Sequence, residues 1–285
     1  MDSHALAEFV DRHPRLFVLT GAGCSTESGI PDYRGAGTPA PARKPIQHDA
    51  FLRRPEVRQR YWARATVGWA RFSRARPNAA HRALAALEEA GHLTGIITQN
   101  VDRLHQEAGS RRVVELHGAL AEVRCLDCQG GEPRSELQDR LLAVNPGWLD
   151  RVAAMAPDGD ADLPAGEVAT FEVVGCRSCG GTLKPDVVFF GGSVAEPTLA
   201  QAWALFDQAE ALLVVGSSLA VYSGYRFAKR AAERGMPMGV INLGPTRADE
   251  LAQARVCERA GDVLPRLAAC LIDANAEVAT VTGAV

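Results

Sequence analysis

The sequence predicts an α/β protein: a doubly wound parallel sheet with a smaller four-cysteine zinc-binding module inserted in it. Two observations support this prediction. Short apolar runs alternate along the chain with segments of helical periodicity, which is the pattern of parallel strands joined by crossover helices. Four cysteines stand in two Cys-x-x-Cys pairs, at residues 125–128 and 176–179, and this spacing is typical of a structural zinc site.

The strands of the predicted sheet are short runs of mainly apolar residues. They are Leu16–Thr20, Gly95–Thr98, Val113–Glu115, Ala211–Val215 and Met238–Asn242. Helical periodicity lies between them, over about residues 77–91, 198–209 and 225–234. Because the strands of a doubly wound sheet end at a common edge, we expect a ligand site at their carboxyl ends.

The two cysteine pairs predict one structural zinc ion. Four thiolates fill a tetrahedral shell and leave no open position for a catalytic water. The expected ligands are Cys125, Cys128, Cys176 and Cys179. Polar, turn-rich sequence separates the pairs by more than a simple zinc ribbon would require. We therefore expect a small zinc domain with an insertion at residues 121–181, and a Rossmann-like domain made of residues 1–120 and 182–285 with a helical excursion at about 36–75.

Composition argues against several classes of partner. The chain has 285 residues and a formal net charge of −3, so its overall charge favours neither nucleic acid nor a membrane surface. No apolar run approaches the roughly 20 residues of a membrane-spanning helix. Seven cysteines, an odd number with metal-type spacing, indicate a reducing compartment. Residues 1–15 fit neither a secretory signal nor a transit peptide. We expect a cytoplasmic protein, of an oligomeric state that the sequence leaves open.

The first strand leads into the loop Gly21-Ala22-Gly23-Cys24-Ser25-Thr26. Glycines at such a strand end allow a pyrophosphate to approach the backbone closely, with amides at a helix start facing it. The dinucleotide fingerprint is incomplete, because Thr26 stands at the position of the third glycine, so a plain tight turn is an equal alternative. Two further strand ends, Gly216-Ser217-Ser218 and Asn242-Leu243-Gly244, favour an extended nucleotide.

Three more segments add polar groups to the same edge. The turn Ser28–Gly35 carries an acid and a guanidinium, and Gln99–His105 offers amides and a carboxylate suited to a ribose or a carboxamide. His117 follows the strand Val113–Glu115. A single histidine is more often structural, but its position at the ligand-binding edge favours a general base.

Together these motifs resemble those of the sirtuins. The matching elements run in the family's order over nearly the whole chain: GAGxSxxSGIPDYR at Gly21–Arg34, QNVD at Gln99–Asp102, His117-Gly118, the two cysteine pairs, Gly216–Ser218 and Asn242–Gly244. Flanking segments such as Val221–Arg226 resemble the class II branch, which contains the mitochondrial lipoamidase and ADP-ribosyltransferase sirtuin. The chain looks like a bacterial-type relative of that protein.

The resemblance implies an NAD-dependent protein-lysine deacetylase or deacylase, which transfers the acyl group to ADP-ribose and releases nicotinamide. The acyl oxygen would attack the ribose to give an alkylimidate. Asp32 and Asn100 would hold the carboxamide, His117 would take a proton from the ribose hydroxyls, and Asp102 would orient Asn100 and the ribose. The NAD contacts that the resemblance implies are Gly21, Ala22, Gly23, Ser25, Thr26, Pro31, Asp32, Tyr33, Arg34, Gln99, Asn100, Val101, Asp102, Gly216, Ser217, Ser218, Asn242, Leu243, Gly244 and Ala260.

The acylated-lysine protein or peptide is expected at Val187–Gly192. An extended apolar stretch that ends in two glycines can pair its backbone with a peptide, and a buried strand followed by a turn is the alternative. The expected contacts are Val188, Phe189, Phe190 and Gly191.

Tyr61 and Arg64 are expected on one face of a helix, because they are three residues apart. A phenol and a guanidinium would bind an acid-ended acyl group, and the spacing resembles that of the desuccinylase sirtuins. The alternative is a surface arginine beside a core tyrosine.

Three other functions fit parts of the sequence. Mono-ADP-ribosyl transfer to a protein needs the same NAD pocket but no acyl tunnel. A zinc-ribbon module that binds nucleic acid lacks support, because acids such as Asp127, Glu132 and Glu136 surround the cysteines instead of a basic cluster. A sensor that binds NAD without turnover is disfavoured by the presence of His117 and Asn100.

Overall fold

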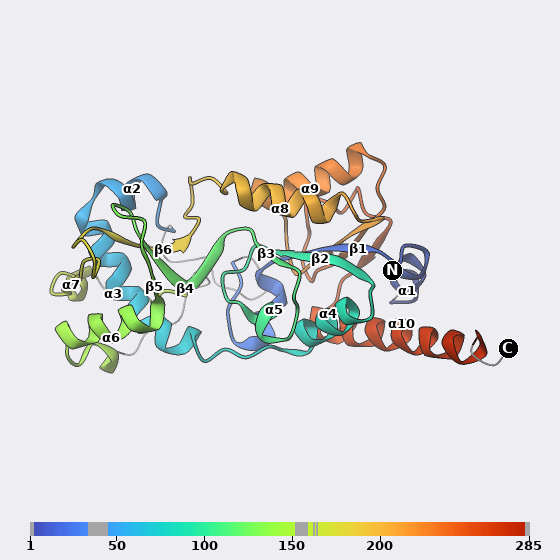
Figure 1. Cartoon of the computed structure of the whole chain (residues 1–285), viewed down its shortest axis with the longest axis horizontal. Coiled ribbons are helices and arrows are strands. Elements are labelled where there is room, and N and C mark those ends of the chain that lie inside the picture. Colours follow the sequence, from blue (N-terminus) through green and yellow to red (C-terminus); the bar gives the residue numbers. More distant parts are fainter. Residues whose placement is uncertain (1–2, 34–44, 152–158, 162, 164, 283–285) are drawn as a thin grey trace.

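The structure is a computed structural model, and it describes residues 3–33, 45–151, 159–161, 163 and 165–282. The described chain forms a larger body around a six-stranded sheet and a smaller body around a three-stranded sheet (Figure 1). This arrangement confirms the predicted α/β fold. Arg34, an expected cofactor contact, lies outside the described residues.

The large sheet is parallel throughout, in the order β3-β2-β1-β7-β8-β9. Its strands are β1 Leu16–Thr20, β2 Leu93–Thr98, β3 Val113–Glu115, β7 Ala211–Val215, β8 Met238–Ile241 and β9 Ala254–Val256. All the predicted runs are strands, although β2 begins two residues earlier and β8 ends one residue earlier than expected. β9 is absent from the predicted set because Arg255 stands between its two apolar residues, so the segment forms no apolar run.

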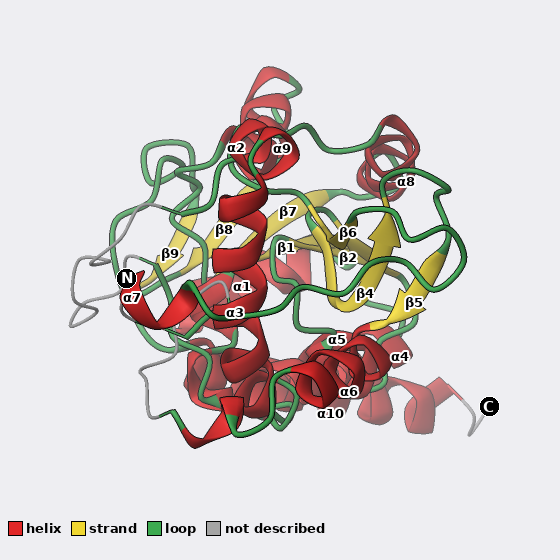
Figure 2. Ribbon diagram, turned by 90° about the vertical axis from the view of Figure 1, so that its left-hand side faces the viewer, coloured by secondary structure: helices red, strands yellow, loops and turns green. Residues whose placement is uncertain are grey.

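Helices cover both faces of this sheet (Figure 2). Successive side chains of a strand point to opposite faces, so Leu16 and Val18 pack in the core beneath α1, α4 and α10. Phe17 and Leu19 pack in the opposite core, with α8 and α9. Burial on both faces explains why the strands are continuous apolar runs rather than alternating ones. The helices are α1 Ser3–Arg12, α4 Ala79–Glu89, α5 Leu104–Glu107, α8 Glu196–Phe206, α9 Tyr222–Glu233 and α10 Ala260–Thr282.

The helix expected at 225–234 begins earlier, at Tyr222. Its first turn packs against the end of β2, since a Cβ atom on Gly224 would lie only 2.7 Å from Oε1 of Gln99. Glycine at this position therefore lets the first turn of α9 approach Gln99, and the extra turn carries Ser223.

The smaller body combines the cysteine segment with two helices from earlier in the chain. Its antiparallel sheet has the order β5-β4-β6. One hydrophobic core joins this sheet to α2 and α3, through residues such as Trp62 and Val123. The sheet itself runs from Gly118 to Val187, and the domain boundaries expected at 121 and 181 stay a prediction. The elements are α2 His48–Arg53, α3 Pro55–Phe72, β4 Gly118–Cys125, β5 Gly131–Pro133, α6 Arg134–Val144, α7 Ala165–Val168 and β6 Leu183–Val187.

No helix within the described ranges is both long enough and apolar enough to cross a bilayer. The longest, α10, runs along α4 and extends beyond the large sheet (Figure 1).

The insertion between the cysteine pairs lies directly on α3. The N–H of Ala161 donates to the carbonyl of Arg64 at 3.2 Å. A Cβ atom on Gly68 would lie 1.9 Å from the carbonyl oxygen of Gly159. The close approach of these two backbones thus requires glycine in the middle of a helix, where alanine would otherwise be favoured.

We predict that Gly68→Ala lowers the free energy of unfolding by about 1–3 kcal/mol, because overpacking against backbone outweighs the gain in helix propensity. Gly166→Ala in α7 is the matched control, since its Cβ atom would meet nothing within 4 Å. Urea unfolding of both variants measures the difference. Equal stability of the two variants would contradict the close contact with α3.

Candidate active site

A cavity of about 800 Å³ lies at the carboxyl ends of β1, β2, β7 and β8. This volume is within the range of about 300–1,000 Å³ that is usual for ligand sites. Among the described residues expected at the cofactor, all but Pro31 line this cavity. Of the expected substrate residues, Arg64 is not among those that line it, whereas Tyr61, Val188, Phe189, Phe190 and Gly191 are. The structure thus brings the separate strand-end motifs into one site.

The floor of the cavity is formed where two loops cross at very short range. The N–H groups of Gly21 and Gly23 donate to the carbonyls of Val215 and Gly216, at 3.0 Å and 2.9 Å. Gly216 has a positive φ of 60°, and a Cβ atom there would lie 2.3 Å from the amide nitrogen of Cys24. The expected helix start is absent from this loop, which forms two 3₁₀ turns, Ala22–Cys24 and Thr26–Ser28. These glycines are therefore required for the close contact between the chain segments that follow β1 and β7.

Ser25, Asn100 and Asp102 form one hydrogen-bonded group on the cavity wall. The hydroxyl of Ser25 donates to Oδ2 of Asp102 at 2.6 Å and accepts from Nδ2 of Asn100 at 3.0 Å. Asn100 also donates to the carbonyl of Gly21 at 3.1 Å. Burial raises the pKa of Asp102, and the bonds from Ser25 and from the N–H of Leu104 oppose that shift. Asp102 therefore orients Asn100 through Ser25 rather than by direct contact.

Two fully buried imidazoles lie behind this group. His81 Nε2 is 3.5 Å from the Ser25 hydroxyl, and His105 Nε2 is 2.9 Å from the hydroxyl of Thr20. Burial lowers the pKa of His81 to about 4 and that of His105 to about 3, so both rings are neutral near pH 7. His81 belongs to a capping box with Asn78 at the start of α4. The sequence analysis assigned no role to these histidines; the Asn-x-x-His pattern at the helix start is the only local signal.

His117 is held at both ring nitrogens. Nδ1 lies 2.9 Å from the carbonyl of Gln99, and Nε2 lies 2.7 Å from the hydroxyl of Ser223. A carbonyl can only accept, so Nδ1 carries the proton of the neutral ring and Nε2 carries the lone pair. Burial lowers the pKa of His117, against a smaller opposing effect of the Gln99 carbonyl. His117 is therefore a neutral base whose basic nitrogen is Nε2.

The expected peptide segment forms a wall of the cavity next to His117. The N–H of Val188 donates to the His117 carbonyl at 2.9 Å, and the carbonyl of Phe190 accepts from the N–H of His48 at 2.9 Å. These two groups already have backbone partners, so an added peptide strand would have to use others. β6 ends at Val187, and strand addition by the residues that follow it stays a prediction.

An aromatic cluster lines the arm of the cavity beneath this wall. The ring of Phe189 lies 5.3 Å from that of Tyr61 and 5.0 Å from that of Phe51. The Lys184 ammonium lies 4.8 Å from the centre of the same Phe189 ring, and burial lowers the pKa of Lys184 to about 8. Asp160, from the insertion between the cysteine pairs, is buried and lines the same cavity. Asp160 could not be predicted as a cavity residue from the sequence, because its contact with the cavity depends on how the insertion packs on α3.

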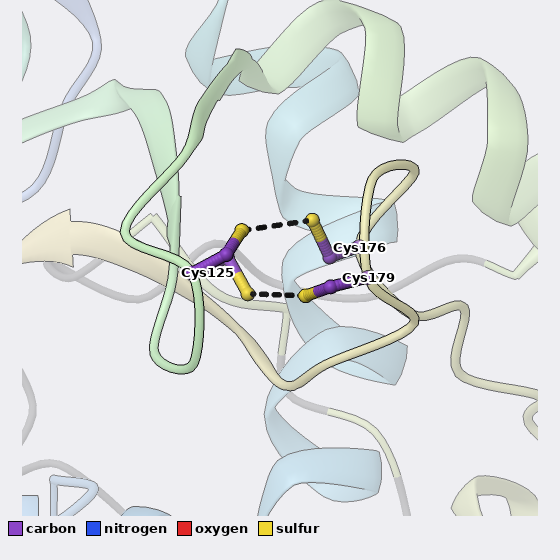
Figure 3. Close-up of side chains that lie close together, drawn as sticks. Cys125, Cys176 and Cys179 are labelled. Carbon is purple, nitrogen blue, oxygen red and sulfur yellow. Dashed lines mark hydrogen bonds between the residues drawn. The ribbon is translucent and has the colours of Figure 1, made fainter.

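The four paired cysteines converge from two loops in the smaller body (Figure 3). Their sulfur atoms all lie within 4.8 Å of one another, with 3.5 Å between Cys125 and Cys179 and 3.7 Å between Cys128 and Cys176. A tetrahedral site with Zn–S bonds of about 2.3 Å needs sulfurs roughly 3.8 Å apart. The N–H groups of Cys179 and Ser178 lower the pKa of Cys176 to about 6, which favours a thiolate. The group fits one structural zinc ion, as predicted.

Comparison with known proteins agrees with this geometry. Residues 21–223 match the Sir2 family. The chain belongs to the Sir2 family. An NAD-dependent protein deacetylase of Xanthomonas campestris is 56% identical over 252 residues, which cover 88% of this chain and 86% of the relative. One from Bradyrhizobium diazoefficiens, named NAD-dependent protein deacetylase 2, is 53% identical over 90% of this chain and 94% of its own.

A class II relative and solved sirtuin structures extend the comparison. The bovine NAD-dependent protein lipoamidase sirtuin-4 is 50% identical over 91% of this chain and 84% of its own. A Sir2 complex with a p53 peptide and NAD+ superposes with a TM-score of 0.74 and 30% identity, covering 94% of this chain and 97% of that one. As a sirtuin, the protein is an NAD-dependent protein deacetylase.

We predict that removing zinc from this sirtuin abolishes deacetylation while most of the large sheet stays folded. The metal would hold together the two cysteine loops of the smaller body. Strand β4 of that body begins directly after His117, and strand β6 leads into Val188, so loss of the metal should displace both residues. Chelation should release about one zinc per chain, measured by elemental analysis, and added zinc should restore turnover.

Cys270→Ser is the matched control for this experiment, because Cys270 is exposed and lies outside the paired cysteines. It should keep both metal and activity, whereas Cys176→Ser should lose both. Full activity of the metal-free protein would contradict the structural role of zinc.

The pH dependence of deacetylation should reflect His117. With the neutral ring as the expected base, activity should fall as pH drops through the pKa of His117, which burial holds below the ordinary value of 6.5. We therefore predict that the rate at saturating substrates stays level down to pH 6.5 and declines only below it. Rates measured between pH 5 and 9, with tryptophan fluorescence to monitor folding, test this. A decline that begins above pH 7 would show that His117 titrates as an exposed histidine.

Proposed function

We propose that this sirtuin removes acyl groups from lysine side chains with His117 as the general base and with the residues of the 800 Å³ cavity as its NAD and acyl-lysine site. The observation that carries the proposal is the position of the His117 imidazole. His117 and Ser223, the partner of its basic nitrogen, both line a cavity whose other walls come from the glycine loop and from Val188–Gly191. NAD is consumed here as a substrate, so one cavity must admit both reactants.

The group of Ser25, Asn100 and Asp102 would orient the nicotinamide end of NAD. Asn100 has two amide protons, and both are directed by acceptors, the Gly21 carbonyl and the Ser25 hydroxyl. Its oxygen is then the atom left to accept from a carboxamide N–H. Asp32 lines the same cavity and would be the second contact of the carboxamide. A nicotinamide held in this way is positioned to leave as the acyl oxygen attacks the ribose.

His117 would act after nicotinamide has left. The ribose hydroxyl must lose a proton before its oxygen can attack the imidate carbon, and a neutral imidazole is suited to accept it near pH 7. The Gln99 carbonyl fixes the tautomer and stabilises the imidazolium that forms, because its bond to Nδ1–H strengthens as the ring becomes positive. Water then completes the reaction, which gives free lysine and an O-acyl-ADP-ribose.

The apolar arm of the cavity favours deacylation over protein mono-ADP-ribosylation. Tyr61, Phe72, Leu120 and Phe189 line it, and ADP-ribosyl transfer would leave that arm without a use. The aromatic and aliphatic side chains of this lining support acyl groups with more apolar surface than acetyl. The proposed receptor for an acid-ended group is Tyr61 with Arg64; Tyr61 lines the cavity, and the Arg64 guanidinium would have to reach into it from the same helix.

We also propose that the protein works in a reducing compartment such as the cytoplasm. The seven cysteines support this, since all are free thiols and four of them form the metal-type group.

A panel of acyl-lysine peptides with NAD tests the function. We predict equal amounts of nicotinamide, deacylated peptide and O-acyl-ADP-ribose, with octanoyl and glutaryl peptides turned over faster than acetyl peptide. Arg64→Ala should lower glutaryl turnover at least about tenfold, the effect of losing one charged hydrogen bond, and leave acetyl turnover unchanged. Mass spectrometry of all products is the measurement.

The outcomes separate the alternatives. ADP-ribose found on protein, with no O-acyl-ADP-ribose, would indicate mono-ADP-ribosyl transfer. Equal effects of Arg64→Ala on both acyl groups would reject the proposed carboxylate receptor. Arg71→Ala on the same helix is a control for general effects of removing an arginine from α3.

A further inference from the structure

Ser223 is the only described side chain that meets the basic nitrogen of His117 through a hydrogen bond. Its hydroxyl lies 2.7 Å from Nε2, a short distance for a neutral pair. Since Nδ1 carries the ring proton, Nε2 must accept, and the Ser223 hydroxyl must donate. The lone pair that a general base would use is thus already occupied by Ser223.

The fold holds Ser223 in this position. The residue lies in the first turn of α9, and only 9% of it is exposed. The next residue, Gly224, packs so closely on Gln99 that a Cβ atom would lie 2.7 Å from the amide oxygen. Gln99 in turn holds Nδ1 of His117 through its carbonyl. Two neighbouring, mutually packed elements therefore hold partners against the two nitrogens of one ring. The backbone of Ser223 is fixed beside His117, and its hydroxyl leaves Nε2 only by a change of the Ser223 rotamer.

Ser223 also lines the large cavity, on the same wall as His117. A ribose hydroxyl that enters the cavity meets an occupied Nε2. It must either displace Ser223 from the ring or bind to Ser223 itself. The serine oxygen has lone pairs that remain available after its proton is directed at Nε2, so it can accept a hydrogen bond from the ribose.

We propose that Ser223 relays the proton from the ribose hydroxyl to His117. The ribose O–H proton passes to Oγ of Ser223 while the Ser223 proton passes to Nε2 of His117. The ribose oxygen forms its bond to the imidate carbon with the electron pair of the broken O–H bond. Serine is unchanged at the end of the step, and His117 is an imidazolium bound to the Gln99 carbonyl at Nδ1 and to Ser223 at Nε2. The proposal rests on the deacylation proposed above.

Ser223→Ala tests the relay, because two parts of the reaction can be read separately. Exchange of labelled nicotinamide into NAD reports formation and reversal of the alkylimidate, before any proton leaves the ribose. Formation of O-acyl-ADP-ribose reports the later step. We expect Ser223→Ala to slow product formation at least about 100-fold, the lower end of the range of roughly 10²–10⁴ that general base catalysis supplies, and to leave nicotinamide exchange nearly unchanged.

Two further variants complete the test. Ser223→Thr keeps the hydroxyl and should recover part of the product rate. Ser110→Ala is the matched control, because Ser110 is a buried serine outside the cavity lining and should behave as the unsubstituted enzyme. Circular dichroism and thermal unfolding of each variant verify the fold.

Each outcome is decisive. Unchanged product formation in Ser223→Ala would mean that the ribose displaces the serine, and the relay would be wrong. An equal loss of exchange and product formation would place Ser223 in NAD binding, which also overturns the relay. Absence of turnover in the unsubstituted enzyme would instead refute the proposed deacylation.

Discussion

The site is built outward from the contact between two strand-end loops. Gly21 and Gly23 donate their amides to the chain at Val215 and Gly216, and the backbones are so close that a side chain at Gly216 would collide with Cys24. This contact places Ser217 beside Gln99, whose side-chain amide donates to the Ser217 hydroxyl at 2.7 Å. The carbonyl of Gln99 then holds His117. A steric requirement at the ends of β1 and β7 thus fixes the ring that would act as the base.

The polar groups behind the cofactor loop depend on one another in the same way. His81, Ser25, Asp102 and Asn100 are connected by successive hydrogen bonds in a region with little solvent. A buried donor or acceptor that loses its partner costs about 1–3 kcal/mol, so each member strongly prefers the one arrangement in which the others are satisfied. The two buried histidines remain neutral, so they would place no positive charge behind the nicotinamide ring, which is itself cationic in NAD, if NAD binds as proposed. The network therefore fixes the orientation of Asn100, and its histidines add no positive charge.

The cavity also depends on the separate core of the smaller body. α2, α3 and the three-stranded sheet bury one set of apolar side chains among themselves, independently of the large sheet. β4 and β6 extend from that core to the cavity, where they contribute Leu120 and Val187 to its walls, and Val188 follows directly after β6. The four-cysteine site lies at the far end of the same strands, since Cys125 is the last residue of β4. Zinc would thus act on the active site through the strands that it anchors, at a distance from the chemistry.

The sequence alone predicted the sheet, the four paired cysteines and a common strand-end edge, and its resemblance to the sirtuins implied the cofactor residues that line the cavity. Strands buried on both faces are continuous apolar runs, paired thiolates have a fixed spacing, and parallel strand ends share one edge, so each signal is local and needs no knowledge of packing. The domain boundaries, the roles of the site residues and the fit of Arg64 to an acyl group stay predictions.

Only the tertiary structure decided which side chains meet across long stretches of chain. Ser223 is 106 residues from His117, and Ser25 is 56 residues from His81, yet each pair lies within hydrogen-bonding distance. Asp160 reaches the cavity because its segment packs on α3 at Gly68. No local sequence pattern predicts these contacts, because they depend on how whole elements pack. Gly68 and Gly224 allow two of these close approaches.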